Sequence, residues 1–131
     1  MRLDYALFTA NGVVVHDGAY GYSNLFDAIV DATYSALEKV GGSNVDIVVS
    51  ETGWPSGGNG VGATVENAKT YNNNVVAHVE KNAGTPKRPG KAIETYLFAM
   101  FNENQKPEGT EQNFGLYQPD MTEVYHVDFS S

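Results

Sequence analysis

The stretch Val45–Ser50, VDIVVS, is followed directly by Glu51–Gly58, ETGWPSGG. The first part is a short run rich in β-branched residues, long enough for one strand and too short for a helix. It lacks the strict alternation of a half-exposed strand, as is typical of a strand buried on both faces. The second part is a loop, because it contains a proline and several glycines. This junction predicts a buried strand of an α/β sheet that ends at a carboxylate.

Helical periodicity flanks this junction on both sides. The segment Ser23–Gly42 begins with residues that can cap a helix, carries apolar residues at helical spacing, and ends in two glycines. We expect its apolar residues to face the core and its acidic residues, such as Asp27 and Asp31, to lie mostly on the opposite face. A second helix is predicted over Thr64–Gly84, with Thr64 as its cap.

The remaining elements complete a small α/β pattern. The segment Asp4–Tyr22 reads as an irregular loop or a short hairpin, with turns at Asn11-Gly12 and Asp17-Gly18. Ala92–Phe101, rich in aromatic and β-branched residues, is a second strand candidate. A strand, a helix and another strand in this order imply a right-handed unit with parallel strands. The chain has 131 residues, whereas a (β/α)8 barrel needs roughly 250, so it is predicted to form a small sheet or a fraction of a barrel.

Composition excludes several classes of function. The chain has no cysteine, which rules out a disulfide scaffold and a thiolate zinc site. Its net charge of −8 argues against nucleic acid and anionic membranes as partners, because phosphates would be repelled. The three histidines match no metal-ligand spacing, so no metal or cofactor is expected. The first residues, Met1–Asp4, do not form a signal peptide, since an acidic residue interrupts any apolar stretch.

Two carboxylates follow the two predicted strands. Glu51 comes directly after the first strand and Glu103 just after the second. Since parallel strands place their carboxyl ends on one edge of a sheet, both should open onto one cleft, with Trp54 beside the first and Lys106 near the second. Such a pair, with an aromatic residue, is typical of glycoside hydrolysis and makes Glu103 a candidate general acid. The alternative is that each is a solvated charge or a partner of a helix cap.

The Glu51 segment resembles the signature of the family 17 glycoside hydrolases, the plant endo-1,3-β-glucanases, in which a strand leads into Ser-Glu-x-Gly-Trp-Pro-Ser. The resemblance covers nearly the whole chain and corresponds to the carboxyl-terminal portion of that family. The other matching segments are Leu3–Phe8, Asn24–Ala28, Thr70–Asn74, Glu94–Lys106 and Asn113–Leu116. Matches of this length are highly specific.

The resemblance implies a role for four charged residues. Glu51 is similar to the family's nucleophile, which forms a covalent glycosyl-enzyme and retains the anomeric configuration. Glu103, Lys106 and Glu111 resemble the charged residues around that nucleophile, which would orient its carboxylate and set its pKa. The resemblance therefore gives Glu103 a supporting role in place of the role of general acid. The family's acid/base glutamate belongs to an earlier barrel strand and has no counterpart among these residues.

The implied fold is α/β: residues 1–131 would be a single carboxyl-terminal fragment of a (β/α)8 TIM barrel with parallel strands and no second domain. Strand edges left unpaired by a partial barrel should favour self-association. Trp54 is expected to anchor its loop and to line the cleft. Tyr22 and Phe114 are candidates to stack on glucose rings, although aromatic residues beside glycines often serve packing instead.

The implied function is endo-hydrolysis of 1,3-β-D-glucan with retention, by a plant defence, pathogenesis-related protein that is secreted or vacuolar. This chain would supply the nucleophile side of the active site, with 1,3-β-glucan as its partner. The alternative is a non-catalytic glucan-binding or allergenic fragment, which holds the same residues but lacks the acid/base group. A structural α/β module without a carbohydrate role is a third hypothesis.

Overall fold

The computed structural model describes residues 1–130. Its residues group into two compact units, which we describe separately. Unit 1 consists of Met1–Val49 and His78–Glu94, and unit 2 of Ser50–Ala77 and Thr95–Ser131. Each unit therefore draws on two separate stretches of chain, and a single barrel fragment stays a prediction. Within residues 1–130, no helix is both long and apolar enough to cross a membrane.

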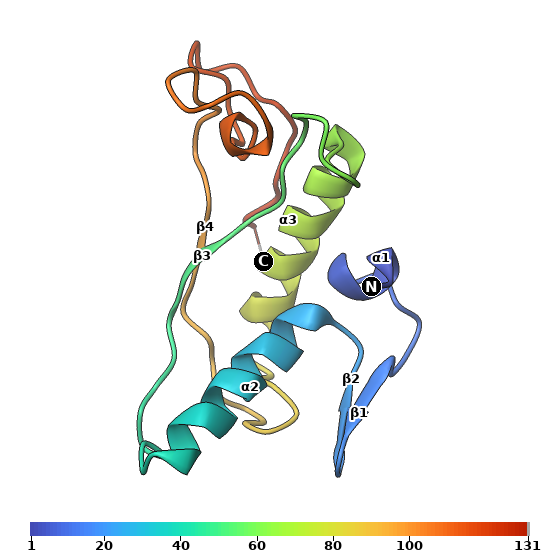
Figure 1. The fold of residues 1–131 in the computed structure, drawn as a ribbon, viewed down its shortest axis with the longest axis vertical. Helices are drawn as coiled ribbons and strands as arrows, with labels where there is room; N and C mark the ends of the chain where they lie inside the picture. The colour runs from blue at the N-terminus through green and yellow to red at the C-terminus, as the bar shows by residue number, and fades with distance from the viewer. Residues whose placement is uncertain (131) are drawn as a thin grey trace. The chain divides into compact units, whose positions relative to one another are not determined.

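Unit 1 begins with a short helix and a hairpin. Helix α1 spans Leu3–Ala6, and strands β1, Val15–Asp17, and β2, Tyr20–Tyr22, pair antiparallel (Figure 1). The turn predicted at Asp17-Gly18 is the one that closes the hairpin, and Gly18 has a φ of 57°, which a glycine adopts without strain. The short hairpin is therefore confirmed, while α1 was not predicted.

Helix α2 spans Leu25–Lys39 and confirms the first predicted helix. Its cap is Asn24, whose side chain accepts a hydrogen bond from the backbone N–H of Asp27. The predicted buried face is wrong, however, because Asp31 is only 2% exposed and Ile29 is 56% exposed. The reason is that polar partners elsewhere in unit 1 satisfy the acidic side chains of this helix.

Those partners form a buried polar cluster around Asp31. Its carboxylate accepts hydrogen bonds from the hydroxyl of Tyr22 at 2.9 Å, from the backbone N–H of Lys87 at 2.9 Å, and from the hydroxyl of Thr85. The loop that follows α3 is thereby tied to α2 and to the end of β2. A buried carboxylate persists in a fold only when such donors satisfy it.

A second polar contact of unit 1 joins Asp27 to His78. The His78 Nε2 atom lies 2.7 Å from the Asp27 carboxylate, and the imidazole ring also packs against Phe8 and Phe26, with ring centroids 5.1 and 6.0 Å away. The buried face of α2 therefore combines carboxylates with aromatic residues.

Strands β3, Val49–Thr52, and β4, Thr95–Leu97, form a two-stranded sheet and run side by side in Figure 1. Val49 N–H donates to the Glu94 carbonyl at 2.9 Å and Phe98 N–H to the Thr52 carbonyl at 2.7 Å. Both chains advance in the same direction between these bonds, so the strands are parallel, as predicted. Both strands are shorter than the predicted segments, and β3 begins four residues later than expected, at Val49 rather than Val45. The prediction that this strand is buried on both faces is wrong, because all four residues of β3 are half-buried or exposed.

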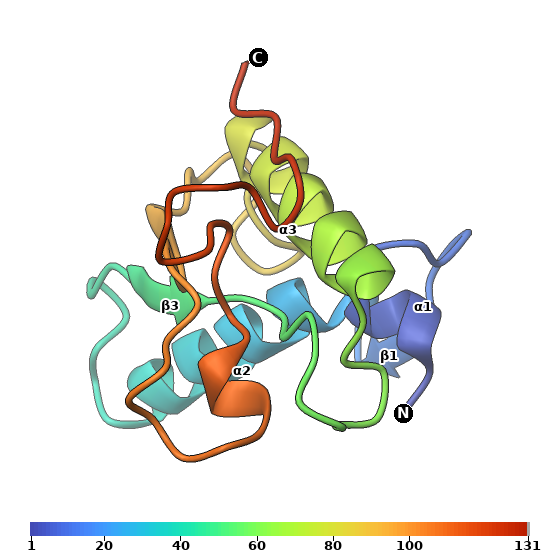
Figure 2. The ribbon, with the colours of Figure 1, turned by 90° about the horizontal axis from the view of Figure 1, so that it is seen from above.

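Unit 2 contains most of helix α3, Val65–Glu80, and the carboxyl-terminal segment that lies along it (Figure 2). The helix confirms the second predicted helix, and Thr64 caps it by accepting from the Asn67 N–H at 3.1 Å. The side chain of Asn73 binds the backbone of the later segment at His126 and Asp128. The apolar core of unit 2 consists of Ala68, Val76, Leu116, Tyr125 and Val127.

Candidate functional site

Glu51 is the third residue of β3, and its side chain is exposed. The next residue, Thr52, fixes this end of the strand on two sides. Its carbonyl accepts from the backbone of Phe98, and its hydroxyl lies 2.5 Å from the hydroxyl of Tyr71 on α3. Burial raises the pKa of Tyr71, so this phenol is neutral across the physiological range. The side chain of Glu51 is therefore exposed to solvent, while the hydrogen bonds of Thr52 fix the backbone beside it.

The loop after Glu51 is anchored by Trp54 and Gly53. The indole Nε1–H of Trp54 donates to the carbonyl of Gly62 at 2.9 Å, and its ring lies against Tyr71 with centroids 5.5 Å apart. A Cβ atom on Gly53 would come within 2.0 Å of the Phe98 carbonyl oxygen. Glycine is thus required where the loop passes the backbone beyond β4. These contacts are those of a loop anchor, and sugar binding by Trp54 stays a prediction.

A second loop of unit 2, residues 102–113, packs against the first. The backbone N–H of Ser56 donates to the Asn113 carbonyl at 2.8 Å, and the Ser56 hydroxyl donates to the same oxygen at 3.1 Å. A Cβ atom on Gly58 would lie 2.2 Å from the carbonyl carbon of Gly109. The loop that follows Glu51 and the segment around Glu111 are therefore in direct backbone contact.

Glu103 and Lys106 form an ion pair in this second loop. The ammonium group of Lys106 lies 3.3 Å from a carboxylate oxygen of Glu103 and 5.0 Å from the centroid of the Phe98 ring. The structure therefore brings together two of the predicted site residues. Phe98 lies beside this pair, and the electron-rich face of its ring attracts the Lys106 ammonium group.

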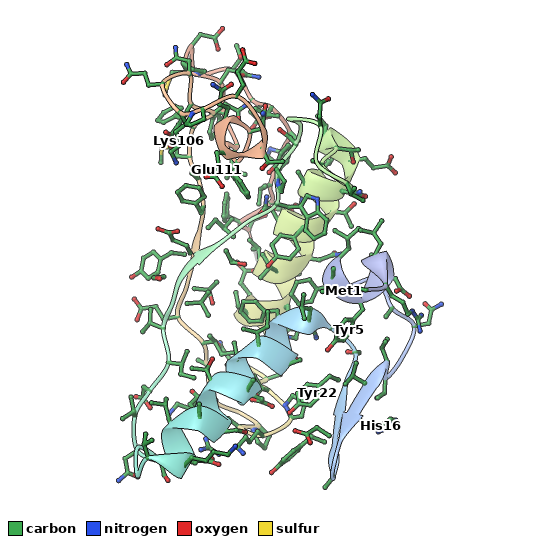
Figure 3. All side chains as sticks on the ribbon, in the orientation of Figure 1. Met1, Tyr5, His16, Tyr22, Lys106 and Glu111 are labelled. Atoms are coloured by element: carbon green, nitrogen blue, oxygen red, sulfur yellow. The ribbon has the colours of Figure 1, made fainter. Side chains whose placement is uncertain are left out.

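Glu111 and Phe114 lie a few residues further along. Glu111 is the central residue of the 3-10 helix η1, Thr110–Gln112, and its side chain is exposed. Figure 3 labels it with Lys106 on the segment that follows β4. Phe114 is half-buried and packs against Phe98, with ring centroids 5.6 Å apart. Phe98 thus contacts both the lysine of the ion pair and a predicted stacking residue.

Tyr22 belongs to unit 1 and lies among different neighbours. It is 5% exposed, points from β2 toward α2 in Figure 3, and donates its hydroxyl hydrogen to Asp31. Burial and this hydrogen bond raise the pKa of Tyr22. A ring enclosed in this way has no free face for a sugar, and we leave it out of the proposed substrate-binding residues.

A shallow open cavity of about 350 Å³ lies beside Glu103, lined in part by Phe101, Asn102 and Pro119. A smaller one of about 240 Å³ adjoins it and is lined in part by Glu103 and Gln112. Among residues 1–130, no group of three or more His, Cys, Asp or Glu side chains is placed to hold a metal ion.

Phe98, Gln112 and Asn113 were not predicted as residues of the site. Phe98 contacts the Lys106 ammonium, and Gln112 and Asn113 hold the second loop through hydrogen bonds. Glu103 and Lys106 are three residues apart in the sequence, so their ion pair depends on no distant part of the chain. No comparable signal identifies the other three, since their contacts depend on how the chain folds back.

The sequence profile described as Glycosyl hydrolases family 17 matches residues 1–129. A glucan endo-1,3-beta-glucosidase of Vitis vinifera is 62% identical to this chain over 131 residues, which cover 99% of this chain and 37% of that protein. The chain spans 37 to 40% of the length of the first curated relatives it matches.

Two solved structures are also similar. One belongs to a study of two plant beta-glucan endohydrolases with distinct substrate specificities; it is 60% identical, has a TM-score of 0.93, and is matched over 98% of this chain and 41% of its own. The other is CJP38, a beta-1,3-glucanase and allergen of Cryptomeria japonica pollen, which is 56% identical with a TM-score of 0.92 and is matched over 99% of this chain and 40% of its own.

Proposed function

Because this chain belongs to family 17 of the glycosyl hydrolases, we propose that it carries the nucleophile side of an active site that hydrolyses 1,3-β-glucan with retention. The single observation that carries the proposal is the exposed carboxylate of Glu51 at the end of a parallel strand, on a backbone held by Thr52 and Gly53. The endo-1,3-glucosidase relatives support the choice of substrate.

In the proposed reaction, a carboxylate oxygen of Glu51 attacks the anomeric carbon of a glucosyl unit. The bond between that carbon and the glycosidic oxygen breaks, and the oxygen takes a proton from an acid group in the remaining part of a (β/α)8 barrel. Water then gives a proton back to that group and attacks the anomeric carbon, which releases Glu51 and completes two inversions at the same centre. The net result is retention.

The charged residues of the second loop would support this step. The ammonium group of Lys106 is held beside Glu103, in the same unit as Glu51. We propose that this pair helps to orient the carboxylate of Glu51 for attack. Glu111, exposed on η1, would add to the same network. Phe114 and Trp54 are the aromatic residues proposed to contact the sugar.

Labelling of the intact chain with an epoxyalkyl glycoside of a 1,3-β-gluco-oligosaccharide tests the nucleophile. Attack by the Glu51 carboxylate opens the epoxide, whose oxygen takes a proton from water, and leaves an ester that peptide mass mapping locates. We expect the label on Glu51 and its loss in Glu51→Gln. The matched control is Glu66→Gln, which changes another exposed glutamate of unit 2, on α3. Label on other carboxylates, or equal labelling of Glu51→Gln, would refute the assignment.

A second candidate function is glucan binding without hydrolysis. Binding would need only the residues that contact the sugar, and the chain spans at most 40% of the length of these relatives. Release of reducing sugar from laminarin separates the two. Release that Glu51→Gln abolishes would exclude a binding-only role. No release, while a complete homologous enzyme works in the same assay, would restrict this chain to binding.

Self-association is proposed from the two-stranded sheet. In the part of the chain that the structure describes, β3 and β4 form a sheet of only two strands. A strand at the edge of so small a sheet can pair with a strand of another chain. Sedimentation should show an association that weakens on dilution, whereas a dilution-stable monomer would oppose the proposal. A secreted or vacuolar location likewise stays a proposal, testable by fractionation of plant tissue.

A further inference from the structure

We infer that Gln112 is a positioning residue that fixes the Glu103–Lys106 pair by holding the Lys106 carbonyl with its side-chain amide. The Nε2 atom of Gln112 donates to the carbonyl oxygen of Lys106 at 2.6 Å. The backbone carbonyl of Gln112 accepts from the N–H of Glu103 at 3.0 Å. Gln112 therefore binds both ends of the segment 103–106, Glu103 through its backbone carbonyl and Lys106 through its side chain. The inference rests on the proposed function for its role in catalysis, while its geometric part stands alone.

The chemistry of this turn explains why a side chain is needed. Pro107 follows Lys106 and has no N–H, so a backbone donor is missing at that position. The turn that follows is closed instead at Gly109, whose carbonyl accepts from the Gln112 N–H at 3.3 Å and from the Asn113 side chain at 2.8 Å. The side-chain amide of Gln112 supplies the hydrogen bond that joins this turn to Lys106.

The ion pair alone is too weak to define its own geometry. The side chains of Lys106 and Glu103 are 34% and 40% exposed and lie 3.3 Å apart. Pairs with this much exposure contribute little free energy, because water screens them and two long side chains must be ordered. A fixed backbone at both residues reduces that ordering cost. The two hydrogen bonds of Gln112 to this backbone thus allow the Lys106 ammonium group to be held in one position.

The position of Lys106 can be observed directly. Its ammonium group lies 5.0 Å from the centroid of the Phe98 ring, so the ring current should displace the NMR signals of the neighbouring methylene protons upfield. The variant Gln112→Met keeps the length of the side chain and the backbone carbonyl that binds Glu103, and removes the amide donor. We expect the upfield displacement to be largely lost, and the rate of Glu51 labelling to fall by about fivefold, as for one lost hydrogen bond.

The control is Gln105→Met, which makes the same chemical change at an exposed glutamine one residue before Lys106. It should leave the Lys106 signals in place. A merely structural role for Gln112 would lower the thermal unfolding midpoint while the signals of the folded chain stayed as in the wild type. If Gln112→Met does not fold, Gln112→Glu serves instead, because an ionised carboxylate cannot donate to the Lys106 carbonyl.

The outcomes of the two measurements are separable. Unchanged Lys106 signals in a folded Gln112 variant would overturn the inference. If the signals move and the labelling rate does not, the positioning of Lys106 has no role in the reaction and the inference fails in its catalytic part. If the wild-type chain is not labelled at all, the proposed function fails, and the NMR comparison still decides whether Gln112 positions Lys106.

Discussion

Two carboxylates of α2 in unit 1 and two of the candidate site in unit 2 lie in opposite surroundings. Unit 1 buries Asp31 and Asp27 and surrounds them with hydroxyl, amide and imidazole groups. Unit 2 builds its core from apolar and aromatic residues and leaves Glu51 and Glu111 exposed. A carboxylate that is enclosed and hydrogen-bonded stabilises the fold and is out of reach of a substrate. The exposed ones on a rigid backbone are the groups that can react.

The largest effect is expected for Asp31→Ala. It removes the acceptor for the hydroxyl groups of Tyr22 and Thr85 and leaves these two buried donors without an acceptor, which should cost about 3 kcal/mol of unfolding free energy. Urea denaturation measures this. The control is Asp17→Ala on the exposed strand β1, and equal effects of the two variants would show that burial of the carboxylate does not matter.

The next effect tests how rigid the Glu51 loop is. Gly53→Ala places a Cβ atom against the carbonyl oxygen of Phe98, so the loop and the chain beyond β4 must move apart. We expect a loss of about 2 kcal/mol and slower labelling of Glu51. At Gly12 a Cβ atom would meet nothing within 4 Å, and Gly12→Ala should stay within about 0.5 kcal/mol of the wild type. Normal labelling in Gly53→Ala would mean that the loop backbone need not be fixed.

A smaller effect concerns a buried polar side chain of unit 2. Asn72 donates to the hydroxyl of Tyr125 at 2.6 Å, and its Oδ1 atom has no hydrogen-bond partner among the described residues. Tyr125→Phe should therefore cost about 1.5 kcal/mol, because Asn72 is left buried with no partner at all.

A double-mutant cycle with Asn72→Leu separates this polar cost from packing. In the Tyr125→Phe background, the added Asn72→Leu change should cost about 1 kcal/mol less than in the wild type. Strict additivity of the two substitutions would contradict an energetic link between the two side chains.

The smallest effect is a dependence on alkaline pH. Burial raises the pKa of Tyr22, Tyr71 and Tyr125, and the hydrogen bond to Asp31 raises that of Tyr22 further. The unfolded chain then loses these protons first, near pH 10, so it binds fewer protons than the folded chain and stability falls as pH rises above that value. Denaturation series between pH 8 and pH 11 should show this decline, with a shallower slope in Tyr22→Phe than in Tyr125→Phe. Equal slopes would remove the distinction between the two units.

Features of the fold that depend on residues close together in the sequence could be predicted, and features that depend on distant residues could not. The two long helices and their caps at Asn24 and Thr64 were predictable, because caps and periodicity act within a few residues. The buried face of α2 was not, since the partners of Asp31 at Thr85 and Lys87 come from a distant loop. Amphipathic patterns treat every aspartate as solvent-facing.

The candidate site divides in the same way. The position of Glu51 at the end of a strand follows from the sequence around it, and the ion pair of Glu103 with Lys106 joins residues only three apart in the sequence. Two hydrogen bonds, from Gln112 to Lys106 and from Ser56 to Asn113, depend on the path of the second loop. A single sequence carries no signal for contacts of that kind.

The interleaving of the two units also matters while the chain is being synthesised. Unit 1 is complete once Glu94 has left the ribosome, whereas unit 2 awaits the carboxyl-terminal segment. Until then, Ala68 and Val76 on α3 have no Tyr125 or Val127 to cover them. The nascent chain therefore passes through a stage with apolar helix surface uncovered, when chaperones would bind and when premature termination would do most harm.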